Sequence, residues 1–168
     1  MHSEAPHHNW FYRRAVLPVL ALLRMGATPQ RLAWSIALGV AVGLNPVLGT
    51  TTVLCLALSF AFRLNVVAAQ IANHAMLPLE LALVVPFIRL GSRVFRTAAM
   101  PLSAEVFLDH ARHAPLALLR QVWVWEWHAF LLWLAISIAL VPVVALGLRP
   151  ILERLERRVR RHQYPIVP

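Results

Sequence analysis

The chain has 168 residues, of which 60% are hydrophobic and only 14% are charged. Soluble domains are typically about 45–50% apolar and about 25% charged, so this composition is typical of a membrane protein. The 16 basic residues, all Arg, outnumber the 7 acidic ones. Basic flanks beside apolar spans are what membrane topology requires, and no nucleic-acid-binding motif accompanies them. We therefore expect membrane lipids as partners and no nucleic acid.

Residues 1–30 carry a short amphipathic segment. As a helix, residues 10–25 would be about 24 Å long, which is shorter than the bilayer hydrocarbon core of about 30 Å. Arg residues also lie on its edges, so we place it at the membrane interface. Thr28 followed by Pro29 then predicts a helix start, because Thr is a good N-cap and Pro suits the first helical position.

The central part of the chain, residues 31–96, begins with a long run that has no charged side chain, residues 32–62. As one helix this run would be about 46 Å long, too long for a core of about 30 Å. Its middle reads GLNPVLGTTT, in which Pro46 and the glycines disfavour helix. We expect two half-helices, 31–44 and 50–62, joined by an irregular turn.

The second apolar segment, residues 66–88, is interrupted at NHAMLP, residues 73–78. Glu80 follows, inside otherwise apolar sequence. An ionisable residue at membrane depth indicates function by default, with His74 or an Arg as the expected partner. The alternative is a structural pair with Arg89.

The C-terminal part contains the clearest spanning helix. Residues 97–128 are amphipathic, suit a membrane surface, and end in WVWEWH, which is typical of an aromatic interfacial belt. Residues 129–148 are twenty uncharged residues, enough to cross a bilayer. The tail, 149–168, is basic. Because arginine-rich flanks stay inside, we expect both termini in the cytoplasm of a bacterial cell, with 32–62 as a hairpin.

The candidate binding residues lie at the two interruptions. Irregular backbone at membrane depth is stable only where protein buries it or where it lines a cavity. The N-terminus of the second half-helix would attract an anionic group such as a lipid phosphate, and paired interrupted segments are a sequence pointer to a transport site. Alternatively, Thr50 to Thr52 cap that helix and the turn only serves packing. The candidates are Asn45, Pro46, Gly49, Thr50, Thr51, Asn73, His74 and Glu80.

Three other features have structural interpretations. Gly39 and Gly43 predict close helix packing, with a homo-oligomer interface as the alternative. Asp109 and His113 have helical ligand spacing, but no fourth ligand is in view, so we predict no metal. No catalytic constellation stands out either, so the sequence predicts no enzyme and no cofactor.

Several of these motifs, in order, resemble the bacterial membrane-protein family called domain of unknown function 2062. The family has an ALG-x-A-x-G stretch, a Pro-x-x-Gly-x-Thr turn, a helix ending in R-L-N, and then an Asn and a Pro before an arginine-containing helix. The matching positions, within roughly residues 28–96, are 37–43, 46–51, 63–65, Asn73 and Pro78. The family differs in often having Pro at position 74 and Gln at position 80. The resemblance implies no established activity, but some relatives are joined to glycosyltransferase-like domains.

We therefore predict an all-α, multi-pass inner-membrane protein whose broken helices meet near mid-membrane. The predicted function is a small transporter or flippase-like protein for an anionic lipid or a lipid-linked envelope precursor. The alternative is a non-catalytic scaffold or assembly factor for envelope biogenesis.

Overall fold

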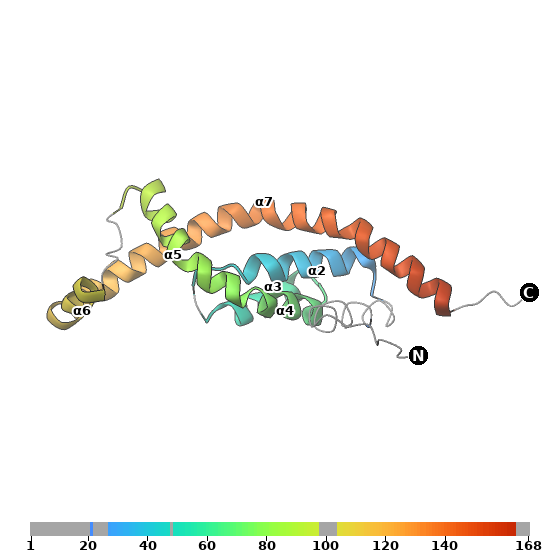
Figure 1. Cartoon of the computed structure of the whole chain (residues 1–168), viewed down its shortest axis with the longest axis horizontal. Helices are drawn as coiled ribbons and strands as arrows, with labels where there is room; N and C mark the ends of the chain where they lie inside the picture. The colour runs from blue at the N-terminus through green and yellow to red at the C-terminus, as the bar shows by residue number, and fades with distance from the viewer. Residues whose placement is uncertain (1–20, 22–26, 48, 98–103, 164–168) are drawn as a thin grey trace, which may run out of the picture.

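The computed structural model describes residues 21, 27–47, 49–97 and 104–163, and its regular structure over these residues is all helical. The all-α prediction is confirmed. The amphipathic helix predicted for residues 10–25 lies outside the described residues, apart from Ala21. Figure 1 shows the labelled helices in chain order: α2 (Pro29–Val42), α3 (Thr51–Ala61), α4 (Val66–Ala75), α5 (Leu77–Val94), α6 (Ala104–His113) and α7 (Pro115–Gln163).

The two half-helices predicted for the first apolar run are present as α2 and α3. The Thr28 side chain caps α2 by accepting the N–H of Arg31 at 3.4 Å. The Arg31 guanidinium in turn donates to the carbonyl of Arg63, just beyond the end of α3. The start of α2 and the end of α3 therefore lie together, and the two helices form a hairpin.

The helices α3 and α5 end in the same way. In both, the second residue beyond the C-cap position turns its N–H back to a serine carbonyl, at 2.8 Å for Leu64 and 2.9 Å for Thr97. The residue before it, Arg63 or Arg96, has a left-handed φ of 53° or 52°. This arrangement is the Schellman motif, in which Gly usually takes the left-handed position. The pattern Ser-x-x-Phe-Arg produces it twice, at 59–63 and 92–96.

Helix α4 lies beside α2 and runs parallel to it. Leu32 near the start of α2 packs in one cluster with Ala68. A Cβ atom added to Gly39 would lie 2.1 Å from the carbonyl oxygen of Ala69, and one added to Gly43 would lie 2.7 Å from that of Asn73. The glycine face of α2 is therefore occupied by α4 within the same chain.

Helix α5 continues from α4 after a bend of 63° at Met76. It then reaches α7, where Ile88 packs against Trp125 and Ala129. Gly91 permits this approach, because a Cβ atom there would lie 3.0 Å from the backbone nitrogen of Ala129.

Helix α7 is one continuous helix of 49 residues, about 74 Å long at 1.5 Å per residue. The boundary expected at residue 128 is therefore not a helix boundary, and the basic tail from residue 149 begins inside the same helix. The segment 97–128, expected to be one surface segment, instead divides near Ala114, between α6 and α7. The helix continues through the aromatic stretch because no Gly or Pro interrupts residues 116–141.

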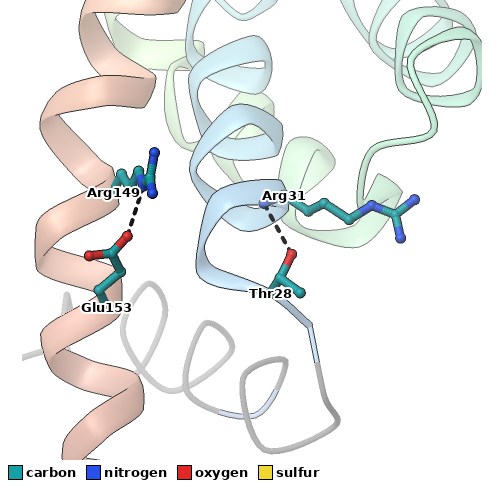
Figure 2. A network of polar contacts seen from close by, with 4 residues as sticks. All are labelled: Thr28, Arg31, Arg149 and Glu153. Atoms are coloured by element: carbon teal, nitrogen blue, oxygen red, sulfur yellow. Dashed lines mark hydrogen bonds and ion pairs between the residues drawn. The ribbon is translucent and has the colours of Figure 1, made fainter.

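Helices α2 and α7 run antiparallel. Leu152 packs on Leu32 at one end, and the indole N–H of Trp133 donates to the carbonyl of Ala41 at the other, at 2.8 Å. Figure 2 shows the first of these ends, where the start of α2 lies next to the part of α7 that carries the ion pair of Arg149 and Glu153, and the Arg31 side chain points away from α7. The pair joins Nε and Oε1 at 2.7 Å.

Among the described residues, one helix, α7, is by itself long and apolar enough to cross a membrane. The bent pair of α4 and α5 is a second candidate if the two helices form one span. Only 22% of the most apolar part of α7 is buried. The core helix of a soluble protein would be mostly buried, so the exposed apolar surface of α7 favours contact with lipid.

Candidate functional site

The turn between α2 and α3 is closed by its own side chains. Asn45 is 1% exposed; its Oδ1 accepts the N–H of Val47 at 3.2 Å, and its Nδ2 donates to Oγ1 of Thr50 at 3.0 Å. The Thr50 hydroxyl donates onward to the Val47 carbonyl at 2.8 Å. Pro46 is buried in this turn and Gly49 is exposed, with a φ of 83°. The Asn-Pro-x-x-Gly-Thr pattern thus forms a compact, internally bonded loop.

The N-terminus of α3 leaves this loop without a side-chain cap. Thr50 occupies the N-cap position, but its hydroxyl is used within the loop and makes no capping bond. Thr51, the first helical residue, is 9% exposed, and Val53 is 72% exposed. The first N–H groups of a helix carry the positive end of its dipole, so this end of α3 offers unneutralised donors beside the turn.

A pocket of about 260 Å³ opens between the turn and α7. Its α7 wall is a stripe of the aromatic stretch, at positions 123, 126, 127 and 130, which helical periodicity places on one face. Most of its lining is apolar, and among the described residues Glu126 is the one charged residue that lines it. The lining residues are Asn45, Val47, Thr50, Leu54, Trp123, Glu126, Trp127 and Phe130.

The aromatic stretch is therefore divided in its exposure. Trp125 is 4% exposed and packs toward α5, whereas Trp123 and Trp127 are 71% and 51% exposed on the pocket side. Trp127 stacks on Phe130 with ring centroids 5.7 Å apart, and Phe130 meets Trp133 at 5.2 Å. The sequence indicated an interfacial belt here but not a pocket wall, because the antiparallel pairing of α2 with α7 is what brings the turn to it.

The second interruption is built differently. Asn73 is 3% exposed, its Nδ2 has only long contacts of 3.5 Å to Gln70 Oε1 and 3.4 Å to His74 Nδ1, and its buried Oδ1 has no hydrogen-bond partner. Glu80 is also 3% exposed. It forms no ion pair within the described part of the chain, so the expected pairing with His74 or Arg89 is not made. His74 itself is exposed.

The two interruptions meet at Gly43. A Cβ atom on this residue would lie 2.7 Å from both the Asn73 carbonyl oxygen and the Met76 Cβ. The pocket nevertheless includes only the first interruption. Of the eight predicted binding residues, Asn45 and Thr50 line it. The other six do not, namely Pro46, Gly49, Thr51, Asn73, His74 and Glu80.

No group of three or more His, Cys, Asp or Glu residues that could hold a metal ion occurs within the described ranges. On α6, Nδ1 of His113 lies 3.0 Å from Oδ1 of Asp109, and both side chains are exposed.

A family model described as "Uncharacterized protein conserved in bacteria (DUF2062)" matches residues 13–163. The chain belongs to this family. The match includes the whole of α2 to α7 and so extends well beyond the resemblance at residues 28–96. Neither curated proteins nor solved structures give a match.

The structure gives a role to two of the motifs that carry the family resemblance. The Pro-x-x-Gly-x-Thr motif, 46–51, overlaps the loop beside the pocket, whose side-chain bonds are made by Asn45 and Thr50. In R-L-N, Arg63 takes the left-handed position, Leu64 joins the core, and the Asn65 side chain caps α4 by accepting the Ala68 N–H at 2.9 Å.

Proposed function

We propose that this DUF2062 protein is a multi-pass inner-membrane protein that binds and moves a lipid, as a small transporter or flippase-like protein. The ligand is an anionic lipid or a lipid-linked envelope precursor, that is, an apolar chain joined to a phosphate. The pocket between the first interruption and α7 carries this proposal, because it pairs apolar walls with a broken helix.

The chemistry of the pocket suits the two parts of such a ligand. Apolar side chains on both walls, such as Leu54 and Phe130, can cover methylene groups. The uncapped N-terminus of α3 starts at the rim of the same pocket and offers N–H donors to a phosphate.

The level of the pocket follows from α7. The stretch 129–148 would occupy the hydrocarbon core, and the pocket lies at its N-terminal end, beside Trp123 and Trp127. Exposed Trp residues favour the interface between lipid and water. The proposed site is therefore at headgroup level and not at mid-membrane.

The arrangement of arginines supports the proposed orientation. Arg31, Arg63 and Arg149 lie at the opposite end of the α2–α3 hairpin from the pocket. With this end in the cytoplasm, the positive-inside bias is met by residues of α2, of the turn after α3, and of α7. The α2–α3 hairpin then enters and leaves on one side.

The test is lipid movement in vesicles that contain the purified full-length protein. We expect it to accelerate the transfer of a fluorescent phosphatidylglycerol between leaflets and to retain phospholipid during purification. Leu54→Trp should abolish both, because the larger ring fills the pocket. The matched control is Val53→Trp, at the neighbouring position on α3, where the side chain is 72% exposed. If the wild-type protein neither moves nor retains lipid, the proposal is wrong.

A scaffold or assembly factor is the second candidate. It is supported by the exposed apolar residues of α3, α5 and α7 and by the arginine-rich end of α7. The glycine face of α2 cannot serve as its docking surface, because α4 covers that face. A scaffold would keep its cellular phenotype in Leu54→Trp, whereas a lipid transporter would lose it.

A further inference from the structure

We infer that the pocket between the α2–α3 turn and α7 binds an ammonium group, and that the lipid recognised there is an amine-bearing phospholipid, in which the ammonium accompanies the phosphate. This inference rests on the proposed lipid-binding function, and it replaces the net anionic ligand of that proposal by a zwitterionic one that keeps the phosphate. It follows from four properties of the pocket: charge, aromatic lining, size and level.

The charge of the lining is negative. Glu126 is half-buried, and it forms no ion pair within the described residues. Among the described residues, no Arg or His lines the pocket beside it. A second anion placed against this carboxylate would be repelled, whereas an ammonium group would neutralise it at short range.

The other side-chain oxygens that line the pocket already accept hydrogen bonds. The Thr50 hydroxyl accepts from Asn45 and donates to the Val47 carbonyl, and Asn45 Oδ1 accepts from the Val47 N–H. The Glu126 carboxylate is therefore the acceptor left for a ligand, and its preferred partner is a cationic donor.

Three aromatic rings share the face of α7 that carries Glu126. Trp123, Trp127 and Phe130 all line the pocket. Trp presents the strongest ring face for a cation, and a carboxylate among aromatic rings is how proteins recognise ammonium and quaternary ammonium groups. An anionic headgroup gains nothing from these ring faces, since their quadrupole is negative.

The size and level of the pocket fit a headgroup. At about 260 Å³, the volume is below the range of about 300–1,000 Å³ that is usual for drug-sized ligands. Trp123 and Trp127 lie just before the apolar stretch 129–148, at the level of the membrane interface. The ammonium and phosphate groups of phospholipids lie at this same level. The chains of the same lipid can then lie along the exposed apolar face of α7.

The experiment is a binding competition on the purified full-length protein in neutral detergent, followed by native mass spectrometry. Short-chain phosphatidylethanolamine and phosphatidylglycerol of equal chain length are mixed in equal amounts. We expect phosphatidylethanolamine to bind about tenfold more tightly, which corresponds to about 1.4 kcal/mol. Water-soluble phosphoethanolamine, added as a third arm, should compete weakly because it lacks the chains.

Variants at two positions locate the preference. Glu126→Gln should reduce the tenfold preference to about one while phosphatidylglycerol binding is retained or increases, because only the charge is lost. Trp127→Ala should also reduce it, whereas Trp127→Phe should restore part of it. The matched control is Glu153→Gln on the same helix, where the carboxylate pairs with Arg149 far from the pocket; it should keep the wild-type preference.

The outcomes separate the ammonium site, the assignment to a lipid, the role of this pocket and the proposed function. Equal or tighter binding of phosphatidylglycerol to the wild-type protein overturns the ammonium site but leaves the lipid-binding proposal intact. Strong binding of soluble phosphoethanolamine overturns the assignment to a lipid. A preference that survives in Glu126→Gln overturns the role of this pocket. Failure of the wild-type protein to bind either lipid overturns the proposed function itself.

Discussion

The two interruptions in the apolar segments look alike in sequence, since each has an Asn and a Pro, but they are stabilised differently. In the first, Asn45 has a partner for both ends of its amide, and the loop closes on itself. In the second, and within the described part of the chain, Asn73 keeps an unpartnered buried oxygen and Glu80 is buried without an ion pair. A chain can therefore break a helix through local bonding or through packing against a neighbour.

The difference shows where each break gets its stability. The side-chain bonds of the first break join Asn45, Val47 and Thr50 to one another, so they are encoded locally. The second depends on α2, because Asn73 and Met76 lie against Gly43. Polar groups buried without partners cost free energy, so the second break is the part of the core in which packing outweighs polar bonding.

The largest effect should come from the contact that brings α4 onto α2. Gly39→Ala would place a Cβ atom 2.1 Å from the Ala69 carbonyl oxygen, which is backbone and cannot move aside. We expect a loss of about 3 kcal/mol or more in unfolding free energy, the upper range for overpacking. Thermal unfolding in detergent, followed by circular dichroism, measures it.

Gly147→Ala is the matched control, because nothing lies within 4 Å of its added Cβ and the residue is also helical. It should be neutral or stabilising by up to about 1 kcal/mol. Similar unfolding temperatures for the two variants would show that α4 does not pack on α2 in this way.

The next effect separates the two asparagines. Asn45→Ala removes both amide bonds of the first turn and should cost about 1–3 kcal/mol. Asn73→Ala removes only contacts of 3.4–3.5 Å, which are at the limit of hydrogen bonding, and should cost less than about 1 kcal/mol. Denaturant or thermal unfolding of both variants checks this order. The reverse order would contradict the distinction between the two interruptions.

Glu80→Gln should increase stability. A buried carboxylate without a cationic partner is destabilising, and the amide keeps its shape without the charge, so we expect a gain of about 1 kcal/mol. The control is Glu153→Gln, which breaks a partly exposed pair with Arg149 and should lose no more than about 0.5 kcal/mol. A drop in melting temperature for Glu80→Gln would mean that the ionised carboxylate has a favourable partner.

The smallest effect concerns the left-handed arginines that end α3 and α5. Arg63→Gly and Arg96→Gly each remove the strain of a left-handed non-glycine residue, offset by the greater chain entropy of Gly, and should each stabilise by about 0.5 kcal/mol. Equal shifts in melting temperature would support two equivalent Schellman ends. A clear loss in only one variant would show that its guanidinium contributes more than its backbone conformation.

Much of the fold could be predicted because it depends on short-range chemistry. Thr28 and Pro29 mark the start of α2, Pro46 and Gly49 mark the first turn, and residues 63–65 mark the passage from α3 to α4. The extent of α7 was not predictable in the same way. Its charged and aromatic first third was interpreted as a separate surface segment, although nothing in residues 116–141 interrupts a helix.

The candidate site was predictable only in part. Asn45 and Thr50 were found from the sequence because breaks in apolar runs are visible there. Trp123, Glu126, Trp127 and Phe130 were not, since they lie about eighty residues away and look like an interfacial belt.

The sequence by itself determined that the chain is helical, apolar and broken at two places, because propensity, capping and turn chemistry act over a few residues. Only the tertiary structure decided that the glycine face of α2 is covered by α4 and that the turn faces an acidic and aromatic stripe of α7. Those contacts depend on how helices far apart in the chain pack, and on the close backbone approach that Gly39, Gly43 and Gly91 allow.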